Sequence, residues 1–203
     1  MQIKKDNIRK NVLKIAREEF FNKGFKDASM RTIAKKAGVG LSNIYNYFQN
    51  KDEIFLEVLS PLMKALDKMM IEHNSSDNLT LDIFYSEEYF VRQTKQFVDL
   101  IVTFKDELKL LLFQSYGSSL ENFRDKYTDL HTEIGLEYIQ KMKEKYPHVN
   151  ANISDFFIHT MSSWWLSIIG EIVSHNLTTK EIEKFISEYI AFGTAGWKKI
   201  MKV

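Results

Sequence analysis

The apolar residues of this chain recur at helical spacing along most of its length. Only two prolines, Pro61 and Pro147, interrupt the 203 residues, and glycine is sparse. No Asn-Gly pair or comparable hairpin signal occurs. The pattern therefore predicts an all-α protein.

The predicted helices follow from this periodicity and from the breaks between periodic stretches. We expect helices over 6–23, two short ones between Ser29 and Phe48, one from Lys51 past Met69, one through Phe90 to Phe104, and then over 107–115, 120–146, 153–175 and 179–201. Pro61 should kink or break its helix. The stretch HNSSDNLT, residues 73–80, is the clearest loop.

Residues Ser29 to Lys51 carry the most specific pattern, SMRTIAKKAGVGLSNIYNYFQNK. Ser29 is placed to cap a first helix through its hydroxyl. Gly38 supplies the positive φ that a sharp turn requires. A second helix is expected from Leu41 to Phe48, with Ile44 and Phe48 on its buried side. This arrangement predicts a helix-turn-helix, which can enter the major groove of DNA.

This segment and the residues before it resemble the N-terminal domain of the tetracycline-repressor (TetR) family over about the first 55 residues. The matching positions are Ala16, Phe20, Gly24-Phe25, Ser29, Ile33-Ala34, Ala37-Gly38-Val39, Ile44-Tyr45, Tyr47-Phe48 and Lys51. The resemblance implies a three-helix DNA-binding domain over 1–50. A helical-bundle effector and dimerisation domain would follow over 51–203, for about nine helices in all. The alternative is a generic three-helix bundle within another helical protein.

Charge is distributed unevenly along the chain. Residues 1–55 hold twelve Lys/Arg and six Asp/Glu, a formal balance of +6, whereas residues 56–203 have a balance of −5. A basic N-terminal segment followed by an acidic remainder is the pattern expected of a DNA-binding protein.

The composition also narrows the class of protein. There is no cysteine, so disulfides, thiolate nucleophiles and thiolate metal sites are excluded. The N-terminus has no secretory signal and no apolar run is long enough to span a membrane. We therefore expect a cytoplasmic protein that has no membrane partner and needs no cofactor or metal.

The resemblance implies a recognition helix over Leu41–Tyr47. Residues expected to face base edges are Leu41, Ser42, Asn43 and Asn46, and those expected to hold phosphates are Ser29, Thr32, Tyr45, Tyr47 and Lys51. No Lys or Arg lies between Ala37 and Asn50, so base contacts should favour A·T pairs. General phosphate attraction would come from Lys4, Lys5, Arg9, Lys10, Arg31, Lys35 and Lys36. The DNA partner would be a palindromic double-stranded operator.

The rest of the chain is rich in aromatic residues, most of which a helical core needs. The resemblance implies that some of them instead line a site for a small hydrophobic or aromatic effector. The candidates are Phe97, Phe104, Phe113, Tyr116, Tyr127, His131, Trp164 and Trp165, with Gln114 and His159 as further polar residues.

The last two helices combine small and bulky apolar residues, as a helix–helix interface does. In the family these helices form a four-helix bundle with their two-fold mates. The candidates are Ser163, Gly170, Ala191, Phe192, Gly193, Ala195, Gly196 and Trp197. The alternative is that the same residues pack within one chain.

Three functions are compatible with these observations. The first is a dimeric DNA-binding regulator, a repressor that a small hydrophobic ligand releases from its operator. The second is a helix-turn-helix regulator controlled by a protein partner, without a small-molecule pocket. The third, an enzyme on a helical bundle, is opposed by the absence of Cys, of an HExxH or Glu-x-x-His pattern, and of Gly-rich phosphate loops.

Overall fold

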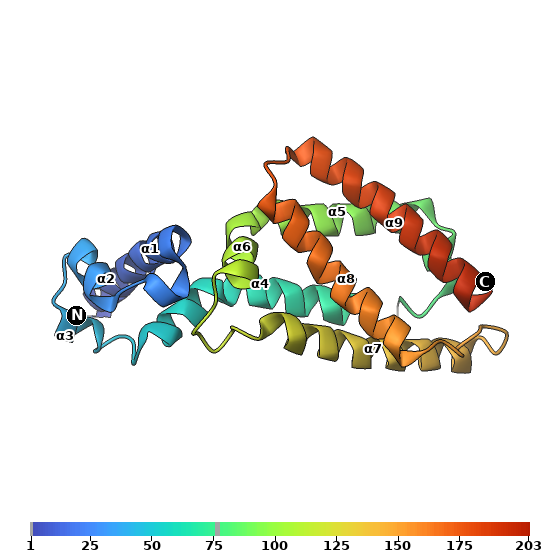
Figure 1. Ribbon diagram of the computed structural model, residues 1–203, viewed down its shortest axis with the longest axis horizontal. Coiled ribbons are helices and arrows are strands. Elements are labelled where there is room, and N and C mark those ends of the chain that lie inside the picture. The colour runs from blue at the N-terminus through green and yellow to red at the C-terminus, as the bar shows by residue number, and fades with distance from the viewer. Residues whose placement is uncertain (1, 76–77) are drawn as a thin grey trace. The chain divides into compact units, whose positions relative to one another are not determined.

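The computed structural model describes residues 2–75 and 78–203, with the backbone alone for residues 2–6 (Figure 1). Every regular element in the described part of the chain is helical, which confirms the all-α prediction. The elements are α1 (Gln2–Asp27), α2 (Met30–Ala37), α3 (Leu41–Ile44), α4 (Lys51–His73), the 3-10 helix η2 (Leu81–Phe84), α5 (Glu87–Thr103), α6 (Lys105–Phe113), α7 (Phe123–Lys145), α8 (Asp155–Ser174) and α9 (Thr179–Met201). None of the described helices is long and apolar enough to cross a membrane.

The chain divides into two compact units, which we call the head and the body. The head runs from the N-terminus to Lys64 and also contains Asp106–Phe123. The body comprises Ala65–Lys105 and Arg124–Val203. Helix α4 contributes its first part to the head and its last part to the body, whereas α6 belongs to the head although it lies far along the sequence. A functional division after residue 50 therefore does not coincide with these compact units.

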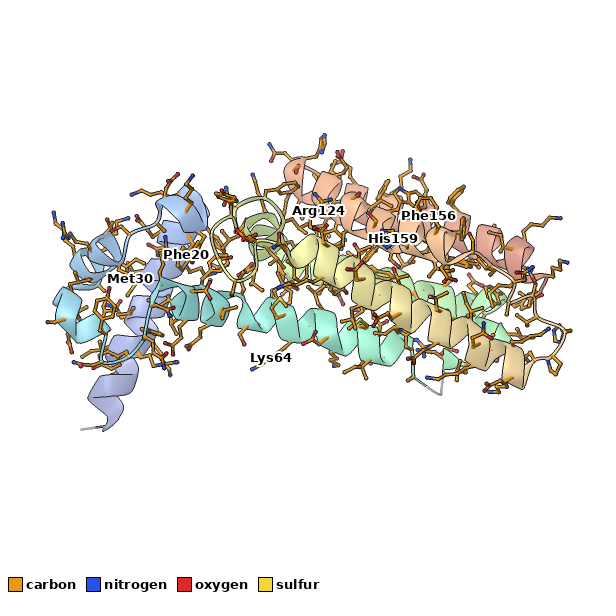
Figure 2. The ribbon with its side chains drawn as sticks, turned by 60° about the horizontal axis from the view of Figure 1, so that its bottom comes forward. Phe20, Met30, Lys64, Arg124, Phe156 and His159 are labelled. Carbon is orange, nitrogen blue, oxygen red and sulfur yellow. The ribbon has the colours of Figure 1, made fainter. Side chains whose placement is uncertain are left out.

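The head is built on three aromatic rings. Phe20, on α1 in Figure 2, is fully buried, and its ring centroid lies 5.1 Å from Phe55 and 6.1 Å from Phe25. Phe25 and Phe55 also meet edge to face at 4.9 Å. Edge-to-face pairs add stability beyond the area they bury. These rings fix α1 against the first part of α4.

The body is held by apolar contacts between longer helices. Helix α9 packs along α5, with Ile182 and Ile186 buried, and Ile101 of α5 is also fully buried. A second apolar cluster is formed by Met142, Val149 and Met201. Asn150 links the segment after α7 to the end of α9 beside this cluster. Its backbone N–H donates to the carbonyl oxygen of Met201, and its side chain donates to the carbonyl oxygen of Ile200.

Several predicted helix ends are confirmed. Gly24 interrupts the helical geometry of α1 with φ 71°, where the sequence predicted the helix to end. Gly38 has φ 68° and ψ 28° at the end of α2. Thr178 and Glu181 form a reciprocal capping box at the start of α9.

Two local predictions were wrong, and of the two alternatives for Pro61, a kink or a break, the break is excluded. The helix expected over 41–48 ends at Ile44, and tighter turns follow it. Ser29 precedes α2, but its hydroxyl makes no capping hydrogen bond. Pro61 does not break α4, which continues from Lys51 to His73. Residues 76 and 77 of the predicted loop lie outside the described residues, and so do the side chains of Lys4 and Lys5.

Candidate functional site

The helix-turn-helix depends on a left-handed residue at Gly38. Two backbone hydrogen bonds stabilise the turn, from Gly38 N to Lys35 O at 3.3 Å and from Val39 N to Ala34 O at 3.1 Å. Ile33 and Ala34 are buried on α2, and Ile44 is buried on α3. The burial of Ile44 that the sequence predicted is therefore confirmed.

Helix α3 presents its polar residues away from the buried side. Ile44 and Phe48 face the interior, whereas the candidate DNA contacts on this segment are at least partly exposed. These are Leu41, Ser42, Asn43, Tyr45, Asn46 and Tyr47, with Tyr45 the most exposed aromatic of the segment at 51%. The structure thus leaves all six candidates at least partly accessible to solvent.

A basic hollow lies on α2, which begins at Met30 in Figure 2. It has a volume of about 480 Å³ and is lined by Arg31, Thr32, Lys35 and Lys36. Ser29, just before the helix, is partly exposed. Cations and a hydroxyl on the surface of one helix are suited to contact phosphate oxygens.

Many of the cations in the head are already paired with head carboxylates. Arg9 binds Glu57 through both terminal nitrogens, and Arg17 donates to Glu107 at 2.7 and 3.0 Å. Lys36 lies 2.6 Å from Glu19, a fully buried carboxylate. These internal pairs reduce the positive charge that the head can offer to an external anion.

Glu19 is the centre of a three-residue charge cluster. Lys23 lies 2.8 Å from one carboxylate oxygen and Lys36 lies 2.6 Å from the other. The hydrogen bonds and charges of these two lysines hold the pKa of Glu19 below its usual value. Since Lys36 is on α2 and Glu19 is on α1, the cluster joins these two helices.

Lys51 is placed differently from the prediction that it contacts phosphate. Its ammonium group donates to the carbonyl oxygens of Phe25, Lys26 and Ala28, at 2.6, 3.1 and 3.0 Å. It also lies 4.3 Å from the centre of the Phe25 ring, and burial lowers its pKa. An ammonium has three N–H donors, so these carbonyls occupy all of them. Lys51 therefore stabilises the end of α1.

Helix α6 and the loop after it also contact the end of α1 and the start of α4. Phe25 N donates to Gln114 O at 2.8 Å, and a side chain at Gly24 would lie 3.3 Å from Gln114. Asp52 at the start of α4 accepts from Ser119 N at 2.8 Å. Sequence reasoning does not find these contacts, because Asp52, Gln114 and Ser119 belong to no recognisable motif.

Two of the predicted effector residues come together in the body. The Phe97 and Trp165 rings meet at 4.4 Å, and Tyr189 stacks on Trp165 at 5.7 Å. Trp164, the neighbour of Trp165 on α8, contacts Tyr189 at 5.4 Å. Phe104 follows α5 and is half-buried. These contacts join α5, α8 and α9 through aromatic rings.

Tyr127 and His131 form a second group on α7. Their ring centroids are 5.1 Å apart. Burial raises the pKa of Tyr127 to about 12 and lowers the pKa of His131 to about 4. Both side chains are therefore uncharged at neutral pH, as suits a site for an uncharged ligand group.

Phe113 and Tyr116, two further effector candidates, join neither group. Both lie in the head, where they are 50% and 67% exposed. Gln114 also lies in the head, and His159 is a surface residue 4.0 Å from Asp129. The density of aromatic residues along a sequence does not reveal the face of the helix on which each one lies.

A separate hollow of about 200 Å³ lies where η2 and the start of α5 meet α9. Its lining residues are Ile83, Phe84, Tyr85, Ser86, Glu87, Tyr89, Phe90, Ile190 and Thr194. None of the predicted effector residues lines this hollow or the one on α2. The described residues contain no group of three or more His, Asp or Glu side chains placed to hold a metal.

An exposed apolar surface runs along α8 and α9. Phe156 of α8 and Phe192 of α9 are 78% and 66% exposed, and Trp164 and Phe185 are also exposed. Figure 2 shows Phe156 on α8. The smaller predicted interface residues Ser163, Ala191, Ala195 and Gly196 are accessible to a partner, and Gly193 is half-buried. A side chain added at Gly193 or Gly196 would meet nothing within 4 Å.

Two predicted interface residues are placed otherwise. Gly170 is buried within its own chain, because α8 turns that side toward the core. Trp197 is half-buried, packs edge to face on Phe157 at 5.6 Å and joins the Met142 cluster. The alternative of packing within one chain therefore describes both residues.

Comparison with known proteins bears on these sites. Residues 12–58 match the model of "Bacterial regulatory proteins, tetR family". The chain is 33% identical over 101 residues to YdgC of Bacillus subtilis, an uncharacterised HTH-type transcriptional regulator. This match covers 50% of the chain, which spans about half the length of that relative, 49%.

Two solved structures share the fold. NalD of Pseudomonas aeruginosa, the secondary repressor of the MexAB-OprM multidrug efflux pump, superimposes with a TM-score of 0.62 at 17% identity, covering 94% of this chain and 96% of NalD. FadR of Bacillus subtilis, a transcriptional regulator solved with stearoyl-CoA, has a TM-score of 0.57 at 16% identity, covering 90% and 97%. At these identities the likeness concerns the fold alone.

Proposed function

Because the chain belongs to the TetR family of bacterial regulatory proteins, we propose that it is a dimeric transcriptional repressor that binds a palindromic operator through α2 and α3. The family consists of transcriptional regulators and not of enzymes. The observation that carries the proposal is the accessible face of α3 beside the basic hollow of α2, both positioned by the Gly38 turn. Residues 1–50 would form the DNA-binding domain and residues 51–203 the effector and dimerisation domain of this cytoplasmic protein.

Phosphate contacts in this proposal come from a smaller set of residues than the net charge indicates. Ser29, Thr32, Arg31 and Lys35 are at least partly exposed on or beside α2, and Tyr45 and Tyr47 are at least partly exposed after α3. Lys51 is excluded from the set because its three donors are occupied. Arg9, Arg17 and Lys36 are weakened as phosphate ligands by their carboxylate partners.

The dimer would form through the exposed faces of α8 and α9. An exposed Phe192 beside small residues at Ala195 and Gly196 is suited to pack against a second copy of the same surface. Two heads would then read the two halves of a palindrome. Ser163, Ala191 and Gly193 complete the proposed interface.

The effector would be a small hydrophobic ligand bound in the body. Support comes from the aromatic group Phe97, Trp165 and Tyr189 and from the uncharged pair Tyr127 and His131. FadR, which shares the fold, was solved with an acyl-CoA. Ligand binding would favour an arrangement of the two heads that does not match the operator.

DNA binding is tested by selecting sequences from random double-stranded DNA with the full-length protein. We expect a two-fold symmetric consensus and an affinity that falls steeply with salt. Arg31→Gln and Lys35→Gln should each reduce the slope of log affinity against log salt by about 0.9 for every phosphate that the variant no longer neutralises. Lys95→Gln, an exposed lysine of the body, is the matched control and should leave the slope unchanged. A selection without two-fold symmetry would refute the proposed operator.

One observation favours a regulator controlled by a protein partner instead. Neither of the two hollows is lined by the predicted effector residues. Titration of fatty acids, acyl-CoAs and aromatic amphiphiles distinguishes the two functions. An effector should change the fluorescence of Trp164 and Trp165 and release the operator. If no compound changes either signal, the partner-controlled regulator becomes the better description.

A further inference from the structure

The side chains of Asn43, on α3, and Asn46, in the turn after it, are joined by a hydrogen bond. Asn46 Nδ2 donates to Asn43 Oδ1 at 3.1 Å, and the backbone N–H of Asn46 donates to Asn43 O at 3.2 Å. Asn46 is exposed and Asn43 is half-buried. From this geometry we infer that Asn43 is a positioning residue, which holds the amide of Asn46 in the orientation that reads adenine in the major groove.

The end of α3 at Ile44 favours this pair. An α-helix has 3.6 residues per turn, so residues three apart are offset around its axis. A 3-10 turn has 3.0 residues per turn, and residues three apart lie directly above one another. At the end of α3 the backbone makes two bonds of the tighter kind, from Asn46 N to Asn43 O and from Tyr47 N to Ile44 O at 2.9 Å, beside one α-type bond from Phe48 N to Ile44 O at 3.1 Å. The tighter turn therefore aligns the two amides.

The chemistry of the amide determines what remains available to DNA. A carboxamide nitrogen carries two N–H groups, and its oxygen accepts. Adenine offers N7 as an acceptor and N6–H as a donor in the major groove, which an Asn amide matches through one N–H and its oxygen. Donating one N–H to Asn43 leaves the second N–H and the oxygen for the base. The same bond prevents the amide from rotating to present its edge in reverse.

Preorganisation also compensates for what the segment lacks. No Lys or Arg lies between Ala37 and Asn50, so a strong guanine contact from the recognition segment is absent. Fixing the Asn46 side chain before binding lowers the entropic cost of its contact with a base. The pair would thus supply sequence preference at one A·T pair in each half-site, while α2 supplies affinity. This inference rests on the proposed function, since it requires an operator.

The test uses the operator selected with the full-length wild-type protein. Each adenine is replaced in turn by 7-deazaadenine, which lacks the N7 acceptor and keeps the N6 amino group. We expect one symmetric adenine position at which the replacement weakens wild-type binding by about 10-fold. Asn46→Ala should weaken binding to the unmodified operator by a similar factor and abolish the response to the modified base.

The double mutant distinguishes positioning from an independent contact. If Asn43 acts through Asn46, Asn43→Ala should weaken binding and reduce the response at the same adenine, and it should have no further effect in the Asn46→Ala background. Ser42→Ala, a change at an exposed neighbour on α3, is the control and should combine additively with Asn46→Ala. Circular dichroism verifies that each variant is folded.

Three results would overturn the inference. They are additive effects of Asn43→Ala and Asn46→Ala, a loss of response at two different bases, and an operator in which no adenine responds to the replacement. Each of these leaves the DNA-binding proposal intact, because specific binding is still observed. A wild-type protein without any specific DNA binding would overturn the proposed function itself.

Discussion

The head and the body differ in the contacts that stabilise each of them internally. In the head, charged side chains join separate helices, as Arg9 with Glu57, Arg17 with Glu107 and Lys36 with Glu19 show. In the described part of the body, ion pairs between lysine and a carboxylate lie within one helix, as Lys95 with Asp99 and Lys184 with Glu188 do. Contacts between body helices are mainly apolar and aromatic.

This difference shows which residues remain available for function. Exposed pairs one turn apart contribute only about 0.3–0.5 kcal/mol, so the body gains little from its ion pairs. In the head, the same residue types hold helices together, and a DNA contact cannot be assigned from charge alone. In the body, aromatic residues exceed what the core covers, and most of the exposed ones lie on α8 and α9, with Tyr85 after η2 the exception.

The largest expected effect concerns that exposed aromatic surface. Phe192→Glu should leave the fold of the monomer nearly unchanged, because Phe192 is 66% exposed. If the surface is the dimer interface, the substitution would bury an unpaired carboxylate, at a cost of several kcal/mol. Sedimentation equilibrium should then show a monomer where the wild type is a dimer.

Val91→Glu provides the control for this substitution. Val91 is an exposed apolar residue of α5, outside the proposed interface. It should change neither the association nor the stability appreciably. Equal dissociation by both variants, or a wild type that is monomeric at micromolar concentration, would contradict the assignment of the interface.

The next largest effect concerns the pH dependence of the stability that His131 in the body contributes. His131 has a pKa lowered to about 4 by burial, against an ordinary value of 6.5. Between these values the unfolded chain binds more protons than the folded one, so stability falls as the pH is lowered from 6.5 toward 4. The full difference corresponds to at most about 3 kcal/mol.

Urea unfolding of wild type and His131→Gln measures this contribution. The free energy of unfolding of the variant should lose that part of its pH dependence between pH 6.5 and 4. Above pH 6.5 the two profiles should run parallel. Glu19→Gln is a contrasting variant in the head, since its lowered pKa stabilises the fold above pH 4.5 and that stabilisation disappears as the pH falls further.

The contrast between the head and the body also explains which features could be predicted from the sequence. In the head, steric requirements at fixed spacing predicted Gly24, Gly38, Ala34 and the buried Ile44 correctly. Helix positions in the body also followed from apolar periodicity. The use of individual side chains could not be read from the sequence, because it depends on contacts between distant residues. Lys51 illustrates this, since its three carbonyl partners lie more than twenty residues away.

The placement of body aromatics depended on similar long-range information. The sequence left both tryptophans of α8 as candidates for one site. Trp165 is 6% exposed and packs on Phe97, whereas its neighbour Trp164 is 37% exposed. The sequence did not show that the effector candidates Phe113 and Tyr116 lie in the head, because α6 joins the head through tertiary contacts that the sequence does not reveal.

A smaller effect tests the structural role of Lys51. Lys51→Met keeps the aliphatic chain but removes three hydrogen bonds to carbonyls. We expect the head to lose about 2 kcal/mol of stability, since hydrogen bonds to a charged group contribute about 1.5–3 kcal/mol each and are not additive. Lys51→Arg should restore the stability only in part, because a planar guanidinium matches three convergent acceptors poorly.

DNA binding distinguishes this role from a phosphate contact. Under conditions where Lys51→Met is fully folded, its operator affinity should show the wild-type salt slope. A stable variant whose slope is smaller by about 0.9 would instead identify Lys51 as the ligand of one phosphate. The measurement therefore decides whether the head keeps this cation for its own stability.

The smallest expected effects compare one glycine of the head with one of the body. Gly38 has φ 68°, and a side chain there would meet nothing within 4 Å, so Gly38→Ala should cost about 1 kcal/mol through backbone strain alone. Gly196 lies within α9 and also has open space around it. Gly196→Ala should therefore stabilise the helix of an isolated chain by up to about 1 kcal/mol.

In a dimer, Gly196→Ala should have the opposite effect on stability. If the backbones of two α9 helices approach closely there, the added methyl group must be accommodated in the interface, and dissociation should become easier although the helix itself is stronger. Thermal unfolding at several protein concentrations separates the two contributions, because only the association term depends on concentration. Gly38→Ala should shift all melting temperatures downward equally. A Gly196→Ala protein that is more stable at every concentration would show that the interface does not use close backbone approach at this position.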